Sequence, residues 1–229
     1  MLLASDEDFL YLNKPAGLPV FPRRTKAGQD ERSVDCMLTR LVAAMPEQSV
    51  PSWPDGFDGG ILHRLDNWTS GLLVAARSLD ALALGRSLFG GGRLRKTYLF
   101  LSQGDVDWSE HTVDRPIAHA KGDRRKMVWQ RGRKTPHRGA WRPARTSFQR
   151  IEGALWRAQM SEGVRHQIRL HAASVGLPLQ GDRLYGGGGE GRFYLHHEEL
   201  GAWPAEGPRA LLPSDWPGPR PGRPEALER

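Results

Sequence analysis

The stretch HRLDNWTSG, residues 63–71, places a His, an Arg and an Asp between two apolar runs of the chain. The preceding ILHRLD and the following LLVAARS are both typical of strands, and the closing Thr-Ser-Gly is typical of a turn. We therefore expect Asp66 to be a carboxylate held rigidly at a sheet edge. The alternative is that Asp66 only caps the turn, as Asp and Asn often do.

The segments around this stretch carry both strand and helix patterns. FLYLNKPAGLPVFP predicts a strand, a Pro and Gly turn and an extended piece, and RKTYLFLSQG predicts another strand. TSFQRIEGALWRAQM predicts a hairpin that turns at Glu152 and Gly153. Helical spacing covers residues 33–45, where Ser33 can serve as N-cap, residues 79–89, and residues 166–176. Because these elements follow no regular βαβ order, the sequence predicts an α+β fold.

Neither a linker nor an internal repeat divides the 229 residues into separate units. We expect one domain over residues 1–212, in which the part after Gly176 forms mostly loops and short strands. We expect residues 213–229, which are rich in Pro and Gly, to form a poorly ordered tail.

Cysteine content and apolar run length restrict the class of protein. The chain has one cysteine, Cys36, so no internal disulfide can form and a reducing compartment is expected. The N-terminal residues lack the pattern of a signal peptide, and the longest apolar runs are far shorter than a membrane span. These features predict a cytoplasmic protein without membrane contact.

Positive charge is concentrated in one window, residues 121–145. The window holds ten Lys or Arg and one acid, a net charge of +9, whereas the whole chain carries +7. Such a concentration is typical of a protein that binds a polyanion, and the interleaved Trp129, Trp141 and Phe148 suit stacking on unpaired bases. The alternative is a solvated, partly disordered loop.

Several patterns that resemble functional sites have simpler explanations. Adjacent side chains of the run His196-His197-Glu198-Glu199 point apart on a strand or on a helix, which disfavours convergence on one metal ion. The glycine-rich residues 186–191 lack the Lys-Ser/Thr that follows a phosphate-binding loop. We therefore expect neither a metal ion nor another cofactor.

The stretch HRLDNWTSGLLVAARS resembles the central motif of the RluA family of RNA pseudouridine synthases, H-R-L-D-x-x-T-S-G followed by hydrophobic residues. Three further segments resemble motifs of that family in the same order: YLNKPAGLPVFP, RKTYLFLSQG and GVRHQIRLHAASVGLPLQGDRLYGG. The resemblance covers residues 9 to about 200. It implies the pseudouridine synthase fold, with a mixed, mainly antiparallel central sheet flanked by helices and loops. Residues 1–212 would be the catalytic domain.

The resemblance also implies roles for individual residues. Asp66 matches the catalytic aspartate, Tyr98 the tyrosine that lies against the flipped base, and Arg169 the arginine paired with the carboxylate. Arg64 matches the arginine that enters the RNA stack, and Ile168 the aliphatic residue of the uracil pocket. Catalytic candidates are thus Asp66, Tyr98 and Arg169. Candidate substrate-binding residues are Arg64, His63, Ile168, Arg165, Lys14, Arg125 and Lys126, although the motif of Lys14 has a more structural role in the family.

The chain departs from the family pattern G-R-x-H-Q-I-R at one place. It reads Gly163-Val164-Arg165-His166, so the first arginine is shifted by one residue. In an extended stretch this shift turns the side chain to the opposite face, and the family's contact is not assigned to Arg165. We also expect a stand-alone domain without an N-terminal S4 domain, in which case RNA is held by the catalytic domain and its basic window.

The expected function is isomerisation of a uridine to pseudouridine in a tRNA or rRNA stem-loop, by a monomer that flips the base out of the helix. Asp66 would attack the sugar, stabilise charge at C1′ or take a proton from C2′, and pairing with Arg169 would favour the anion. The alternative is a non-catalytic RNA-binding or chaperone protein on the same fold, which would have no use for the buried carboxylate. A glycoside hydrolase is a weaker alternative, since no motif supplies a second catalytic carboxylate.

Overall fold

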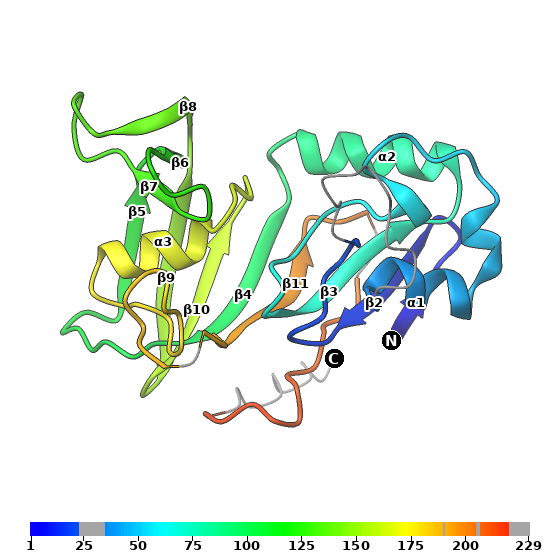
Figure 1. Ribbon diagram of the computed structural model, residues 1–229. Coiled ribbons are helices and arrows are strands. Elements are labelled where there is room, and N and C mark those ends of the chain that lie inside the picture. The colour runs from blue at the N-terminus through cyan, green and yellow to red at the C-terminus, as the bar shows by residue number, and fades with distance from the viewer. Residues whose placement is uncertain (23–34, 190, 205–206, 220–229) are drawn as a thin grey trace.

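The computed structural model describes residues 1–22, 35–189, 191–204 and 207–219, whose elements are shown in Figure 1. The strands are β1 (Leu2–Ser5), β2 (Phe9–Lys14), β3 (Thr69–Ala76), β4 (Arg95–Leu101), β5 (Glu110–Asp114), β6 (Ile117–Ala120), β7 (Met127–Trp129), β8 (His137–Arg142), β9 (Arg145–Glu152), β10 (Leu155–Met160) and β11 (Leu195–Gly201). The helices are α1 (Met37–Ala44), α2 (Leu79–Gly90) and α3 (Gln167–Ser174), with short 3₁₀ turns η1 (Pro46–Ser49) and η2 (Asp58–Gly60).

The described strands form one large sheet and one small sheet. The large sheet has the order β1-β2-β3-β11-β4-β10-β9-β5, and the small sheet has the order β7-β6-β8. Only the pair of β3 and β11 is parallel among these strand pairs. The predicted α+β class and the mixed, mainly antiparallel sheet are therefore confirmed, as is the hairpin of β9 and β10.

The parallel pair at the centre of the large sheet depends on Gly71. This residue pairs with His197 of β11 and has a φ of +107°. A Cβ at this position would lie 2.2 Å from the carbonyl oxygen of His197, so only glycine allows the two backbones to approach this closely. Thr69, Ser70 and Gly71 thus open β3, which corrects the prediction that they form a turn. The turn precedes them, at Asn67 and Trp68.

The segment before that turn forms no regular strand, contrary to the prediction for ILHRLD. It runs along the part of β3 that lies beyond its pairing with β11: Ile61 forms an isolated bridge with Ala75, and the amide of Leu62 donates to the carbonyl of Val74. One step further, the imidazole of His63 accepts from the amide of Val74 at 3.2 Å. A side chain takes the place of the backbone acceptor here, and the strand pattern therefore ends.

The helices match their predicted positions with one difference. α3 lies within residues 166–176, α2 begins at Leu79 and extends one residue beyond the predicted 79–89, and Ser78 caps α2 by accepting from the amide of Ala81. The helix predicted over 33–45 begins only at Met37, where Cys36 and Thr39 form a reciprocal cap. The proposed cap Ser33 lies outside the described residues.

The central strands are buried on both faces, which fixes the sheet in the middle of the molecule. Every residue of β3 is buried, and alternate residues of β2 and β3 belong to two hydrophobic clusters. One cluster includes residues of α1 and α3, and the other includes residues of α2. The sheet therefore provides rigid support for residues at the ends of its strands.

The C-terminal part of the chain differs from its predicted pattern. β11 lies in the middle of the large sheet, although only loops and short strands were predicted after Gly176. Residues 213–219, the described part of the predicted tail, pack onto the sheet through Trp216, which is buried against Leu99, Leu101 and Leu155. Residues 220–229 lie outside the described residues.

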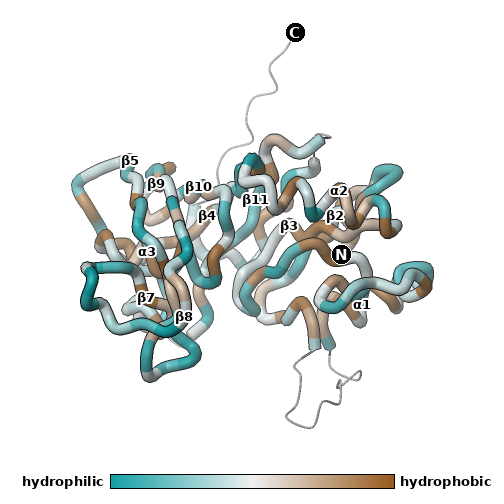
Figure 2. The backbone as a smooth tube through the Cα atoms, turned by 90° about the horizontal axis from the view of Figure 1, so that it is seen from above, coloured by the Kyte–Doolittle hydropathy of each residue, from teal (hydrophilic) through white to brown (hydrophobic). Residues whose placement is uncertain are grey.

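The basic window, residues 121–145, contains β7 and β8 of the small sheet, which also includes β6. Figure 2 shows the tube around β7 and β8 largely in the hydrophilic colour. All ten Lys and Arg side chains of the window are exposed. The window is thus a folded surface that displays cations, and the alternative of a partly disordered loop does not describe it.

Candidate active site

A cavity of about 1180 Å³ opens over the middle of the large sheet. Its walls come from residues 61–69, from β4, from the start of α3 and from the small sheet. The structure brings eight of the ten predicted site residues to this cavity, namely His63, Arg64, Asp66, Tyr98, Arg125, Arg165, Ile168 and Arg169. Lys14 and Lys126 are not among its lining residues.

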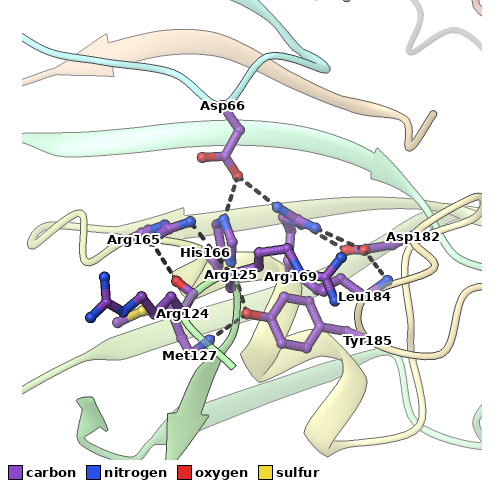
Figure 3. A network of polar contacts seen from close by, with 10 residues as sticks. All are labelled: Asp66, Arg124, Arg125, Met127, Arg165, His166, Arg169, Asp182, Leu184 and Tyr185. Carbon is purple, nitrogen blue, oxygen red and sulfur yellow. Dashed lines mark hydrogen bonds and ion pairs between the residues drawn. The ribbon is translucent and has the colours of Figure 1, made fainter. Parts of the chain in front are cut away.

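Asp66 is held at the cavity wall by an arginine that is itself held from behind (Figure 3). Nη1 of Arg169 donates to Oδ2 of Asp66 at 3.0 Å. The other side of the same guanidinium donates to both oxygens of Asp182, at 2.7 and 2.8 Å. Because such a two-bond contact fixes the plane of the guanidinium, Arg169 has little freedom to follow Asp66 if the latter moves.

Burial and charge act in opposite directions on this arginine. Arg169 is 6% exposed and Asp182 is 1% exposed, whereas the side chain of Asp66 is 30% exposed. Burial alone would lower the pKa of Arg169, but hydrogen bonds and charge from Asp182 and Asp66 raise it above its usual value. The guanidinium stays charged, and the Asp66 carboxylate is both held and reachable from the cavity.

Tyr98 of β4 supplies an aromatic wall of the cavity. Its ring stacks on His197 of β11, with centroids 4.5 Å apart and an angle of 21° between the planes. Burial, with a further contribution from the charge of Asp66, raises the pKa of Tyr98 well above its usual value. The hydroxyl therefore keeps its proton at neutral pH.

His166, the residue directly before α3, also lies close to Asp66. Its Nε2 lies 3.8 Å from Oδ2 of Asp66, and its Nδ1 lies 2.8 Å from the hydroxyl of Tyr185. Tyr185 also accepts from the amide of Met127, the first residue of β7. These contacts connect the cavity wall to the small sheet (Figure 3).

Lys14 does not face the cavity, which corrects its grouping with substrate-binding residues. The side chain is fully buried, and Nζ donates to the carbonyl oxygens of Asn67 at 2.9 Å and Pro15 at 3.0 Å. Burial lowers the pKa of Lys14 to about 7, against the opposing charge of Asp66. Its ammonium fixes the backbone directly after Asp66 and is not accessible to RNA.

His63 lines the cavity but is engaged by its neighbours. Its ring stacks on Phe89 and meets His197 edge to face, and Nε2 accepts from the amide of Val74. Burial lowers the pKa of His63 well below its usual value. These contacts hold the segment before Asp66 against β3, and they argue against the substrate-binding role predicted for His63.

The remaining predicted binding residues lie at the rim. Arg64 is exposed at the cavity, and Ile168 is buried in its wall at the start of α3. The guanidinium of Arg165 is exposed and donates to the carbonyl oxygens of Arg124 and Arg125 at 3.4 Å. Lys126 is exposed on the same turn, outside the cavity lining.

Two of the aromatic residues predicted to stack on bases, Phe148 and Trp129, differ in their exposure. Phe148 is 2% exposed and packs edge to face on Phe100, so it cannot stack on RNA bases as predicted. Trp129 is half-buried and has the guanidinium groups of Arg115 and Arg131 over its ring, at 4.2 and 5.6 Å. Trp129 thus lies among cations that suit a polyanion.

Sequence reasoning missed three residues that complete the site: Asp182, Tyr185 and His166. Each lies within the quoted segment GVRHQIRLHAASVGLPLQGDRLYGG, so its place in a motif was the only available signal. His166 is the N-cap residue of α3 and has a φ of +57°, which is uncommon for residues other than glycine, although Asn, Asp and His adopt it more often than the rest. No residue pattern indicates this backbone conformation in advance.

Two features are absent from the described part of the chain. None of its helices combines the length and the apolar character needed to cross a bilayer. Among the same residues, no group of three or more His, Cys, Asp or Glu is arranged to hold a metal ion.

Comparison with known proteins gives a family from the sequence and a shared fold from the structure. The family model described as RNA pseudouridylate synthase matches residues 8–174. A ribosomal large subunit pseudouridine synthase D of Nitrosomonas europaea is 33% identical over 192 residues, which cover 81% of this chain and 49% of the relative. An enzyme of the same name from Pseudomonas aeruginosa is 31% identical over 191 residues, covering 81% of this chain and 53% of the relative. The chain spans about half the length of the curated relatives it matches.

A solved human structure, RNA pseudouridylate synthase domain containing 1, superimposes with a TM-score of 0.67 at 23% identity. The match covers 87% of this chain and 76% of the human chain. A second human structure, RNA pseudouridylate synthase domain containing 4, gives a TM-score of 0.64 at 24% identity, covering 87% of this chain and 82% of that chain. Both likenesses confirm the predicted fold.

Proposed function

Since the chain belongs to the RNA pseudouridylate synthase family, and to its RluA branch, we propose that it converts a uridine in structured RNA to pseudouridine. The observation that supports this most strongly is the placement of Asp66 in a cavity wall, ion-paired to Arg169, which Asp182 fixes from behind. A protein that only binds RNA has no need for a partly exposed carboxylate that a buried arginine holds in place, because a carboxylate repels phosphate.

The reaction exchanges one bond of the base for another and needs no oxidant or reductant. The bond between C1′ and N1 of uracil breaks, the base turns over, and C1′ is joined to C5. C5 loses its proton and N1 gains one. The proposed role of Asp66 is to act on the sugar while C1′ carries positive charge, and Arg169 keeps the carboxylate ionised and directed.

The base must leave its helix to reach Asp66, at a cost of a few kcal/mol. In the proposed complex the ring of Tyr98 and the side chain of Ile168 form the walls against which the flipped uracil packs. Arg64, exposed at the rim, fills the space that the base leaves in the stack. Stacking and hydrogen bonds of this kind offset the cost of unpairing.

RNA is held mainly by the small sheet in this proposal. Ten exposed cations between residues 121 and 145 present a field that attracts phosphates, and Arg124, Arg125 and Lys126 lie on the turn nearest the cavity. The substrate is a stem-loop of tRNA or rRNA. Two relatives are named ribosomal large subunit pseudouridine synthase D, which favours rRNA.

We place the proposed activity in residues 1–212 of a monomer in the cytoplasm. The residues that line the cavity all lie within residues 1–212, and Cys36, the single cysteine, is buried and free. A buried free thiol is compatible with a reducing compartment.

The test uses tRNA and rRNA labelled with tritium at C5 of uridine, from cells that lack the protein. Wild type should release tritium, and Asp66→Asn, which keeps the shape and loses the charge, should not. Equal silence of both proteins on all RNAs would contradict the proposal. If both bind RNA in a salt-dependent way without release, the non-catalytic RNA-binding alternative gains support.

Tyr98→Phe refines the assignment, because it keeps the ring that stacks on His197 and removes the hydroxyl. RNA affinity should be retained. A lower rate of tritium release assigns the hydroxyl a part in the reaction, whereas an unchanged rate restricts Tyr98 to packing against the base.

A further inference from the structure

Three groups in contact form a chain from the small sheet to Asp66 (Figure 3). The amide of Met127 donates to the hydroxyl of Tyr185 at 2.9 Å. That hydroxyl lies 2.8 Å from Nδ1 of His166, and Nε2 of the same imidazole lies 3.8 Å from Oδ2 of Asp66. The pairing of Asp66 with Arg169 makes no use of this chain.

The direction of the chain follows from its first member. A backbone amide can only donate, so the oxygen of Tyr185 accepts from Met127 and its single proton is left for Nδ1 of His166. Burial raises the pKa of Tyr185 to about 12 and lowers the pKa of His166 to about 4, so both groups are neutral at pH 7. A neutral imidazole that accepts at Nδ1 carries its proton on Nε2. Nε2–H therefore faces the carboxylate of Asp66.

The backbone at His166 is held in an unusual conformation for this arrangement. Its φ of +57° lies in the left-handed region, which costs a residue with a Cβ free energy unless the surroundings hold it there. The side chain is 7% exposed, and its ring meets the ring of Tyr185 edge to face at 5.7 Å. The strained backbone directs the imidazole between Tyr185 and Asp66.

A second connection ties the same part of the chain to the small sheet. Arg165, the residue before His166, donates to the carbonyl oxygens of Arg124 and Arg125, which lie in the turn between β6 and β7. The side chains of Arg124, Arg125 and Lys126 on this turn are exposed. Residues 165 and 166 thus meet the cationic turn at two points, one through Arg165 and one through Tyr185.

We propose that Tyr185 and His166 are positioning residues. They couple the position of the cationic turn, which carries Arg124, Arg125 and Lys126, to the orientation of the Asp66 carboxylate. RNA phosphates that bind the turn hold β7 in place, and the hydroxyl of Tyr185 then orients Nε2–H of His166 toward Oδ2. The carboxylate is thereby restrained from two sides, by Arg169 and by His166. This inference rests on the proposed function.

The first test needs no activity. In unliganded full-length protein labelled with ¹⁵N in histidine, His166 should show Nε2 protonated and Nδ1 unprotonated, assigned by comparison with His166→Asn. Asparagine is chosen because it tolerates the left-handed backbone. In Tyr185→Phe the nitrogen shifts of His166 should move toward a mixture of tautomers. A proton on Nδ1 in wild type would overturn the proposal. So would nitrogen chemical shifts of His166 that are the same in wild type and in Tyr185→Phe.

The second test separates positioning from binding. Tyr185→Phe keeps the ring beside Arg169 and removes only the hydroxyl. Tritium release from bound RNA in a single turnover should slow roughly ten- to a hundredfold, the range expected for a misplaced reacting group, with RNA affinity unchanged. The matched control is Tyr194→Phe, since Tyr194 packs on Trp216 and does not line the cavity. It should react like wild type.

The outcomes remain distinguishable if the proposed function fails. A wild-type protein that releases no tritium from any RNA contradicts the function, whereas the nitrogen shifts still decide whether the hydrogen-bond chain exists. Equal single-turnover rates for Tyr185→Phe and wild type would overturn the positioning role even with the expected tautomer. Loss of RNA affinity in Tyr185→Phe, with the rate from bound RNA unchanged, would overturn it as well.

Discussion

Two charged regions of this protein are built in opposite ways. In the first, Asp66, Arg169 and Asp182 meet at the wall of the cavity, and the latter two are almost wholly buried and bonded to each other. In the second, the ten cations of residues 121–145 are all exposed. Of these ten, only Arg125 and Arg145 have an ion-pair partner among the described residues. Charges that must keep one geometry are paired and buried, whereas charges that attract a polyanion stay exposed.

The difference predicts separate signatures for substitutions in the two regions. Breaking a buried pair leaves an uncompensated charge in a poorly solvated place, so stability and reaction rate should both suffer. Removing an exposed cation should change stability and reaction rate only slightly. It should instead lower RNA affinity and alter how that affinity depends on salt.

The largest effect is expected for Asp182→Asn. The amide cannot compensate the buried guanidinium of Arg169, and loss of one partner of such a pair costs about 3–5 kcal/mol. Urea unfolding should show this loss, and tritium release should fall because Arg169 no longer holds Asp66 in place. Asp123→Asn, which makes the same change beside the exposed Arg125, is the control and should leave the unfolding midpoint nearly unchanged. Equal midpoints for the two variants would remove the distinction between the regions.

A smaller effect concerns the acid stability of the large sheet. His196 of β11 is fully buried between Ser70 and the carbonyl of Ala210, and burial lowers its pKa from 6.5 to about 4. The unfolded chain therefore binds more protons between these two pH values, and the free energy of unfolding falls as the pH drops through that window. This residue contributes up to about 3 kcal/mol of the loss. Urea titrations from pH 7 to 4 should show a shallower fall in His196→Gln, and an identical slope would contradict the assignment.

The smallest effect on stability is expected for Arg124→Ala and Lys126→Ala on the cationic turn. Each should leave the unfolding midpoint near that of wild type and weaken RNA binding. Each should also reduce the slope of log K against log salt by about 1, as expected for one lost phosphate contact. Arg40→Ala on α1, at the other end of the molecule, is the control and should change neither quantity (Figure 1). A salt slope unaffected by both turn variants would place the RNA elsewhere.

The sequence predicted the parts of the fold in which local pattern and tertiary structure agree. α2 and the hairpin of β9 and β10 lie where the spacing of apolar residues and the position of the glycines predicted them. β11 escaped prediction because its residues His196 and His197 are polar and yet fully buried, and they form hydrogen bonds with Ser70 and with the carbonyl of Leu72. A hydrophobic pattern cannot show a strand whose buried positions are filled by hydrogen-bonded histidines.

The site was predictable in its motif residues and not in their supports. Asp66, Tyr98 and Arg169 were nominated by resemblance, and the structure brings them to one cavity. Asp182 went unassigned because a buried partner of Arg169 depends on a turn 13 residues further along the chain. Lys14 was grouped with the substrate contacts because charge in a sequence does not reveal burial, and its ammonium proved to hold the backbone of Asn67.

One variant, Asp66→Asn, tests most directly whether catalysis and RNA binding depend on separate regions of the protein. RNA bound and tritium released should be measured together in a single turnover, over a range of salt concentrations. The expected result is wild-type affinity with an unchanged salt slope and no detectable release of tritium from the bound RNA. Release at the wild-type rate would contradict the role of the carboxylate, and joint loss of binding and release would contradict the separation of the two regions.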